Sequence, residues 1–364
     1  AYALIHRAYH ALPPLSTKSG EIVNAVFGFT SILMKVIGDF KPDYVTAAFD
    51  LPEPTFRHKE YKGYKATRPE APPDLYSQIP RVKEILKAFG IPIYEKSGYE
   101  ADDIIGTISK QLQNKDIEIV ILTGDMDTLQ LVGNNIKVYT PKRGLSDPIV
   151  YDEKKVVERF GGLTPGQLND FKGLKGDPSD NIPGVKGIGE KTAIILLNRY
   201  KSIEKLYEAV GKDEVEGASE SVLEKLKNGK EMAFFSKKLS TLDLNVPINF
   251  SLKENEFEKP DKNNLIKVFK DLGFLRLIER LNISGEQGAL LMPAKTTAQI
   301  NYQKIPQDLS WEKLNKELKT VQEISLSYRL NTGGLSAQAG DLEALAVGAD
   351  ENIYILENNF SNIS

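Results

Sequence analysis

The first half of the chain alternates short β-type runs with stretches of helical periodicity. Asp43–Phe49 and Ile117–Leu122 are compact apolar runs typical of strands. Ile22–Ile37 and Gln78–Phe89 instead repeat apolar residues at the spacing of a helix face. Strands that alternate with helices indicate a mostly parallel sheet covered on both faces. We therefore expect an α/β core over residues 1–153.

The second half follows a different pattern. Residues 154–281 are largely helical in periodicity, with glycine-rich turns between the helical stretches. Residues 282–300 lose all periodicity, which predicts a linker. Beyond it we expect a truncated α/β tail over residues 301–364, with a helix at Leu309–Thr320 and strands at Ile324–Leu330 and Asn352–Leu356.

Composition limits the chemistry that the chain can perform. Its 364 residues favour two domains and a linker, and no apolar run is long enough to span a membrane. There is no cysteine, which excludes disulfides, thiolate zinc sites and cysteine nucleophiles and agrees with a cytoplasmic protein. The net charge of −3 argues against a uniformly basic coat for nucleic acid, but it permits a local basic groove.

Carboxylates that follow strands or begin tight turns are the strongest chemical signal. In open α/β sheets, ligands bind beyond the carboxyl ends of the strands, so such side chains converge on one crevice. Any one pair alone is more often a helix cap or a solvated turn, but four groups together favour a shared site. The groups are Asp50; Glu100, Asp102 and Asp103; Asp125 and Asp127; and Asp177 and Asp180.

Clustered carboxylates of this kind predict bound metal ions. They repel one another unless a cation neutralises them. Ligation by oxygen alone suits Mg²⁺ or Mn²⁺ better than zinc. Two such ions about 4 Å apart can activate water and stabilise the leaving oxygen in phosphodiester hydrolysis.

A basic segment, Phe56–Arg68, comes directly after Asp50. It holds five Lys or Arg residues against one glutamate, with Tyr61 and Tyr64 between them. Basic side chains bind phosphates, and aromatic rings stack on unpaired bases. An isolated run like this is as often a solvated helix face, but its position beside an acidic group favours contact with nucleic acid.

A glycine turn over residues 184–189 precedes a helix that is expected to begin near Glu190. Bare backbone N–H groups at a helix N-terminus bind phosphate without reading sequence. Lys186 and Lys191 add positive charge. Such a turn is often only a connector, but the flanking lysines favour a phosphate-binding role.

Together these motifs resemble the 5′-nuclease (flap endonuclease) domain of bacterial DNA polymerase I. The matching segments are RAYHALPP, FDLPEPTFRHKEYKGYKATRP, GYEADDIIG, ILTGDMDTLQL and GLKGDPSDNIPGVKGIGEKTA, in the family's order from residue 1 to about 282. The resemblance implies a PIN-like parallel sheet with an arch in residues 1–153 and a helix–three-turn–helix subdomain in residues 154–281. Residues 301–364 resemble the start of a 3′–5′ exonuclease-like domain, expected to be inactive because ISLSYRL lacks an acid.

The resemblance also assigns roles to individual residues. It implies one metal group of Asp50, Glu100, Asp102 and Asp103, and a second of Asp125, Asp127, Asp177 and Asp180. It assigns Tyr64, Lys65 and Arg68 to the arch base, where they would act on the scissile phosphate. The residues expected to contact DNA are Arg57, Lys62, Gly184, Lys186, Gly187, Gly189, Lys191 and Thr192, with a K⁺ ion as a further expectation at the glycine turn.

The implied protein is a monomeric nuclease of the bacterial cytoplasm, associated with the nucleoid. It would use two Mg²⁺ or Mn²⁺ ions to remove RNA primers and 5′ flaps from flapped or nicked DNA. In the family, an aspartate ends the first strand, and here it would precede Ala1. A fragment that begins at Ala1 is thus expected to be poorly stable and nearly inactive.

Two other functions remain open from the sequence. One is a catalytically incomplete module that only binds DNA. The other is a Mg²⁺-dependent phosphatase of small molecules, which would also use aspartates at strand ends. The phosphatase has no use for the basic segment or for the lysines of the glycine turn, so it is the least favoured.

Overall fold

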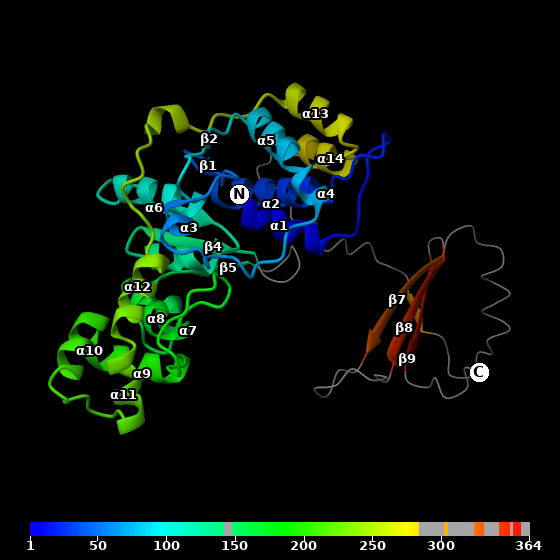
Figure 1. Cartoon of the computed structure of the whole chain (residues 1–364). Helices are drawn as coiled ribbons and strands as arrows, with labels where there is room; N and C mark the ends of the chain where they lie inside the picture. Colours follow the sequence, from blue (N-terminus) through cyan, green and yellow to red (C-terminus); the bar gives the residue numbers. More distant parts are fainter. Residues whose placement is uncertain (142–147, 284–301, 305–323, 331–341, 350–351, 358–364) are drawn as a thin grey trace. The chain divides into compact units, whose positions relative to one another are not determined.

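The computed structural model describes residues 1–141 and 148–283, together with four strands between residues 302 and 357. The chain divides into two compact units, Ala1–Leu290 and Leu291–Ser364, each described here by itself (Figure 1). Among the helices described, none has both the length and the apolar character needed to cross a membrane.

Five short strands form the centre of the first unit, in two separate sheets. β1 (Ala47–Ala48) pairs in parallel with β2 (Ile93–Tyr94). β3 (Ile119–Leu122) pairs in parallel with β4 (Ile136–Thr140), which is antiparallel to β5 (Ile149–Tyr151). The two strands predicted from the apolar runs are confirmed, although both are shorter than the runs. The mostly parallel arrangement is confirmed as well.

Helices cover both faces of these strands. Neighbouring side chains of a strand point to opposite faces, and here both faces carry apolar side chains that have to be buried. Ala47 and Phe49 pack into the cluster that contains α2 and α5, whereas Ala48 packs into the cluster that contains α6. The helices of this core are α1 (Tyr2–Ala11), α2 (Asn24–Phe40), α3 (Phe56–Glu60), α4 (Pro73–Tyr76), α5 (Ile79–Ala88) and α6 (Ala101–Leu112).

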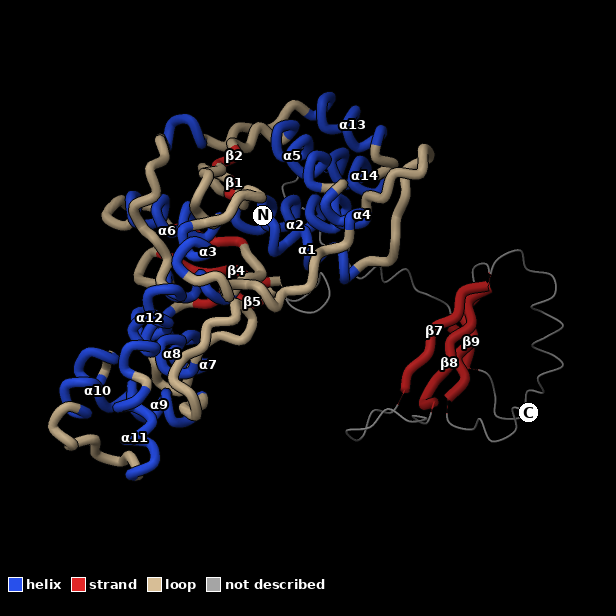
Figure 2. Tube along the Cα trace, viewed as in Figure 1, coloured by secondary structure: helices blue, strands red, loops and turns tan. Residues whose placement is uncertain are grey.

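A helical lobe follows the sheets, and Figure 2 shows it as a group of helices without strands. It begins after β5 with α7 and has its own apolar core, which includes Phe171, Leu197 and Leu206. Its helices are α7 (Glu153–Arg159), α8 (Leu168–Lys175), α9 (Glu190–Tyr200), α10 (Ile203–Val210), α11 (Glu220–Asn228) and α12 (Lys230–Ser240), with a 3₁₀ turn at Pro165–Gln167.

The chain then returns to the α/β core, so the expected helical subdomain over 154–281 is not one packed body. After a 3₁₀ turn at Leu252–Asn255 come α13 (Lys262–Asp271) and α14 (Leu275–Ile283). The ring of Phe274 lies edge-on to Phe27 of α2 at 5.2 Å, and Phe269 lies 6.4 Å from Phe89. Periodicity indicates an apolar helix face, but it does not say which core that face will cover.

The second unit contains a sheet of four strands in the order β6-β9-β8-β7. β6 and β9 are parallel, and the other two pairings are antiparallel. The two strands expected in the tail are confirmed. The first two residues of the expected linker, 282–283, belong to α14, and the rest of the linker and the expected helix lie outside the described residues. The strand bounds are Tyr302–Lys304 for β6, Ile324–Leu330 for β7, Leu342–Ala349 for β8 and Asn352–Glu357 for β9.

Packing of α13 on the α/β core gives a stability prediction. Phe269 is fully buried, so Phe269→Ala should lower the free energy of unfolding by about 3–5 kcal/mol, as for other buried aromatic truncations. Leu275→Ala is the control, because Leu275 is 65% exposed. Urea unfolding followed by circular dichroism measures both variants. Equal stability of the two would contradict the packing of α13.

Candidate functional site

Five of the predicted acidic residues line one small polar cleft, together with Arg57, Tyr64 and Lys65 from the basic segment. We call it the acidic cleft and define it by Glu100, Asp102, Asp125, Asp127 and Asp180. These residues come from the start of α6, from the turn after β3 and from the loop after α8. The prediction that separate acidic groups converge is therefore met for three of the four groups.

The remaining group and the loop are next to this cleft. Asp50 follows β1, and its Oδ1 accepts a hydrogen bond from the backbone N–H of Ala101 at 2.9 Å. That N–H is at the beginning of α6, directly before Asp102. Asp177 closes its own loop by accepting bonds from the N–H and the hydroxyl of Ser179, at 2.9 and 2.6 Å.

Local capping explains why the acids are at these positions. Glu100 is the N-cap of α6, and Asp125 caps the 3₁₀ turn Met126–Leu131 by accepting from the N–H of Asp127 at 3.0 Å. Carboxylates are favoured at helix N-termini because they satisfy free N–H groups there. Glu100 and Asp125 thus hold the backbone in place as caps. This structural role is additional to any chemical role.

Cations offset part of the negative charge of the acidic cleft, and Arg57 is one of them, 3.5 Å from Glu100. Lys65 Nζ lies 2.8 Å from Glu100 Oε1, and Arg68 pairs with Asp180. Lys172 of α8 bridges Asp127 and Asp177. Lys172 was missed in the sequence, although its place one helical turn before the acidic loop was a usable signal.

Burial and mutual repulsion raise the proton affinity of two cleft carboxyls. Burial, with the charges of Asp125 and Asp50, holds the pKa of Asp102 well above its usual range. Burial also raises the pKa of Asp127 to about 6, even though the ammonium of Lys172 opposes the shift. Because ionised carboxylates this close are costly, the cleft needs added positive charge.

The donor set is all oxygen, as Mg²⁺ and Mn²⁺ prefer. In the part of the chain that the structure describes, no three acidic or histidine side chains already converge into a metal site. The side chains of Lys65, Arg68 and Lys172 occupy carboxylate oxygens instead. The residues therefore fit metal ions in their chemistry and charge, provided that these cations move aside.

Asp103 and Arg57 depart from their expected roles, because they form a buried ion pair. Asp103 is 0% and Arg57 1% exposed, and both guanidinium ends meet the carboxylate, at 2.7 and 2.8 Å. Asp103 also accepts from the N–H groups of Glu100 and Asp243. Its oxygens are therefore occupied, and Arg57 is too deeply buried to contact DNA. Both assignments are corrected to structural roles.

The basic segment runs beside the acidic cleft and is fastened to the loop 177–181. The N–H of Lys65 donates to the carbonyl oxygen of Asp180 at 2.9 Å, and the amide of Asn181 donates to Gly63 O at 2.7 Å. Tyr64 is buried, and its hydroxyl donates to Glu100 at 3.2 Å and to Asp180 at 3.0 Å. Lys62 is exposed. The basic segment thus fixes the positions of Glu100 and Asp180 relative to each other.

The glycine turn divides into a buried and an exposed part. Gly184 is buried with φ +63°, and a Cβ there would come within 2.2 Å of the backbone nitrogen of Gly176. Its expected contact with DNA is therefore wrong, and its role is to allow the close approach of two backbones. Lys186, Gly187 and Gly189 are exposed.

The start of α9 follows this turn. Gly189 is the N-cap of α9, and no side chain caps the helix. Lys191 is exposed and Thr192 half-buried in the first turn. The free N–H groups and the adjacent lysines form a surface suited to a phosphate.

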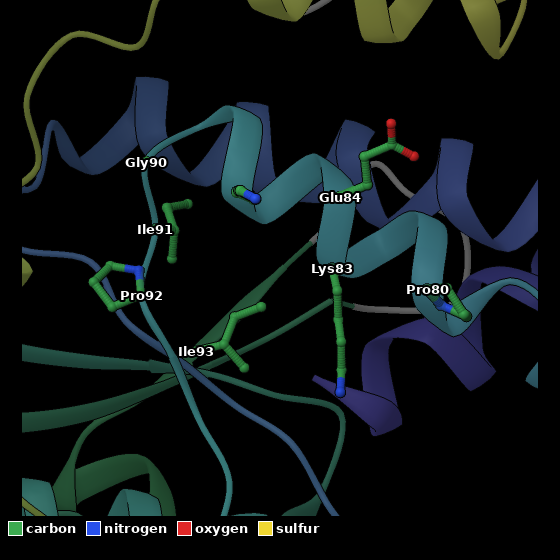
Figure 3. A pocket seen from close by; sticks show the side chains of 8 residues that line it. Pro80, Lys83, Glu84, Gly90, Ile91, Pro92 and Ile93 are labelled. Atoms are coloured by element: carbon green, nitrogen blue, oxygen red, sulfur yellow. The ribbon is translucent and has the colours of Figure 1, made fainter.

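A larger surface hollow, of about 660 Å³, lies elsewhere, beside α5 and β2 (Figure 3). It is lined by Pro80, Ile91, Pro92 and Ile93 among others, and it shares no residue with the acidic cleft. Of its two lining lysines, Lys83 and Lys87, the first pairs with Glu95. The hollow therefore supplies none of the predicted chemistry.

Comparison with known families agrees with this arrangement. Residues 1–161 match the N-terminal resolvase-like domain of 5′-3′ exonucleases, and residues 163–263 match the C-terminal SAM fold of the same enzymes. Together the two matches cover most of the chain. The chain belongs to the 5′–3′ exonuclease family.

The similar full-length sequences are bacterial DNA polymerases I. The chain is 41% identical over 326 residues to the Bacillus subtilis enzyme, covering 90% of this chain and 36% of that protein. It is 43% identical over 284 residues to the Caldicellulosiruptor bescii enzyme, covering 78% and 33%. The chain thus spans about a third of the length of these relatives.

Solved structures share the fold at low sequence identity. A bacteriophage T5 5′-exonuclease with bound divalent metal ions (zinc) superposes with a TM-score of 0.55 at 16% identity, covering 78% of this chain and 94% of that one. The T5 D15 protein crystallised with metal ions gives 0.54 at 18% identity, covering 75% and 96%. At this identity the likeness shows the fold alone.

The buried pair of Arg57 and Asp103 gives a second prediction. Arg57→Met should lower the free energy of unfolding by about 3–5 kcal/mol, because it leaves a buried carboxylate unpaired. Adding Asp103→Leu should recover only part of that loss, since it removes the orphaned charge but leaves the N–H groups of Glu100 and Asp243 without their acceptor. Lys62→Met, at an exposed site of the same segment, is the control. Chemical unfolding of the wild type, the two single variants and the double variant measures these differences. Equal free energies of unfolding for Arg57→Met and Lys62→Met would contradict the structural role of the pair.

Proposed function

We propose that this chain is the metal-dependent 5′-nuclease part of a DNA polymerase I. It would hydrolyse phosphodiester bonds in DNA that carries 5′ flaps, nicks or RNA primers. The observation that carries the proposal is the acidic cleft, bordered by Lys65 and Arg68, in a chain of the 5′–3′ exonuclease family. A similar fold is found in a complex of the Rad2 catalytic core with DNA substrate, with a TM-score of 0.50.

Two groups of carboxylates would hold Mg²⁺ or Mn²⁺. Asp50, Glu100 and Asp102 form one group, and Asp125, Asp127, Asp177 and Asp180 form the other. When bound, such ions supply an activated water and charge neutralisation at the leaving oxygen. Asp103 is left out of the first group because Arg57 and two backbone N–H groups already occupy its oxygens.

The cations of the cleft would then act on substrate. Lys65 and Arg68 now compensate Glu100 and Asp180. If these carboxylates were neutralised by bound metal ions instead, Lys65 and Arg68 would become available to bind the scissile phosphate. There they would stabilise its developing charge. Lys172 would be released in the same way if metal ions bound to Asp127 and Asp177.

Tyr64 would be a positioning residue. Its hydroxyl joins Glu100, at the start of α6, to Asp180, in the loop after α8. Burial, reinforced by these two carboxylates, raises the pKa of Tyr64, so it remains a hydrogen-bond donor. It would keep the two acidic groups at a constant separation without touching the phosphate.

The exposed part of the glycine turn would hold the duplex. Backbone N–H groups at the start of α9, with Lys186 and Lys191, suit a phosphate of either strand and carry no sequence information. A K⁺ ion could share the carbonyl groups of this turn. Lys62 and Thr192 would add contacts, and the protein would act as a monomer.

The metal assignment is tested by removing one carboxylate charge. In the full-length protein, Asp125→Asn should lower Mg²⁺-dependent cleavage of a 5′-flap substrate at least about 100-fold, the loss typical of one electrostatic group in an active site. DNA affinity should stay within a few fold of wild type, because the lost charge repels phosphate. Asp116→Asn, in an exposed turn, should cleave normally. Near-wild-type cleavage by Asp125→Asn would refute the assignment.

The division between reacting phosphate and duplex backbone is tested by lysine substitutions. Lys65→Ala should lower the single-turnover cleavage rate more than it weakens binding. The double change Lys186→Ala/Lys191→Ala should weaken duplex binding for all sequences and reduce the slope of log K against log salt by up to about 2. Lys87→Ala/Lys115→Ala, at exposed sites, is the matched control. If both test variants changed only affinity, the division would be wrong.

A further inference from the structure

The first helix carries a pair of histidines that the proposed nuclease chemistry does not use. His6 and His10 are both exposed and lie one turn apart on α1. Their Nε2 atoms are 3.3 Å apart and their ring centroids 4.4 Å apart. The outer nitrogens of the two rings thus lie next to each other on the exposed face of α1.

That separation is the one a shared metal ion requires. Zinc binds imidazole nitrogen at about 2.0–2.1 Å with tetrahedral angles, so two such nitrogens lie roughly 3.3–3.4 Å apart. Histidines at positions i and i+4 of one helix face also form the zinc pair of H-E-x-x-H metalloproteases. A hydrogen bond between the rings gives a similar distance, so an experiment has to separate the two.

We propose that His6 and His10 chelate one transition-metal ion of the zinc type, with water in the remaining positions. Among the described residues no third histidine or acid joins them. The site is therefore a two-ligand surface site of moderate affinity. Because imidazole suits Zn²⁺, Ni²⁺ and Cu²⁺ whereas Mg²⁺ prefers oxygen, it is chemically distinct from the acidic cleft.

The surroundings of His6 favour its neutral, metal-binding ring. Burial, followed by the charges of His10 and Arg68, lowers the pKa of His6. The ring of Tyr9 stands edge-on to His10 at 5.1 Å, and its hydroxyl is held by Asp74 at 2.8 Å. These contacts restrain the pair before any metal arrives.

Calorimetric titration with Zn²⁺, in excess Mg²⁺ so that oxygen sites are filled, tests the proposal. The wild-type chain should bind one Zn²⁺, and His6→Ala and His10→Ala should each bind it at least about tenfold more weakly, since even outer-shell losses cost that much. His58→Ala is the matched control, because His58 Nδ1 is engaged by Thr55 at 2.9 Å. Retention of the untagged protein on a Ni²⁺ resin should follow the same order.

Three results would overturn the proposal. The first is a wild-type chain that binds no Zn²⁺ under these conditions. The second is unchanged binding by the double variant His6→Ala/His10→Ala, which would locate the zinc on the carboxylates. The third is a loss in His58→Ala equal to that in the other two variants. Both substituted residues are exposed, and matching melting temperatures confirm that each variant is folded.

Discussion

The acidic cleft depends on the buried ion pair between Arg57, which is one of its lining residues, and Asp103. The guanidinium also donates to the carbonyl oxygens of Leu239 and Thr241, each at 2.9 Å. One buried side chain therefore joins the basic segment, the start of α6 and the end of α12, which are far apart in sequence. Such a pair is weak as a source of stability but costly to break. It fixes the relative positions of three segments, two of which carry the cleft residues Lys65, Glu100 and Asp102.

The cleft itself brings several carboxylates together in a buried place, where the ionised form of each is costly. The raised pKa values of Asp102 and Asp127 record the cost, and the pairing of Lys65, Arg68 and Lys172 with the acids reduces it. The same cations serve two purposes in the proposed function. They balance the carboxylates while no other cation does, and they become free for phosphate when the carboxylates are neutralised. In the proposed function, affinity for metal and affinity for substrate would thereby be coupled.

Much of this could be predicted from sequence, because local patterns carry it. The run Ile117–Leu122 gave a strand, and its end gave the positions of Asp125 and Asp127. Asp103 was misjudged because spacing along a helix cannot reveal a partner 46 positions away. Gly184 was misjudged for a similar reason, since its need for glycine comes from the backbone of Gly176. Partners distant in sequence are set by packing, which periodicity does not encode.

Helix α1 has one face that packs into the core and an opposite face that carries the two exposed histidines. Its buried face, with Leu4, Ile5 and Ala8, packs on α2, where a Cβ on Gly28 would come within 2.7 Å of the Cβ of Ala8. That close approach leaves α1 little freedom to shift. The helical period sends His6 and His10 to the opposite, exposed face. Their rings are therefore held by a rigid support yet take no part in the core.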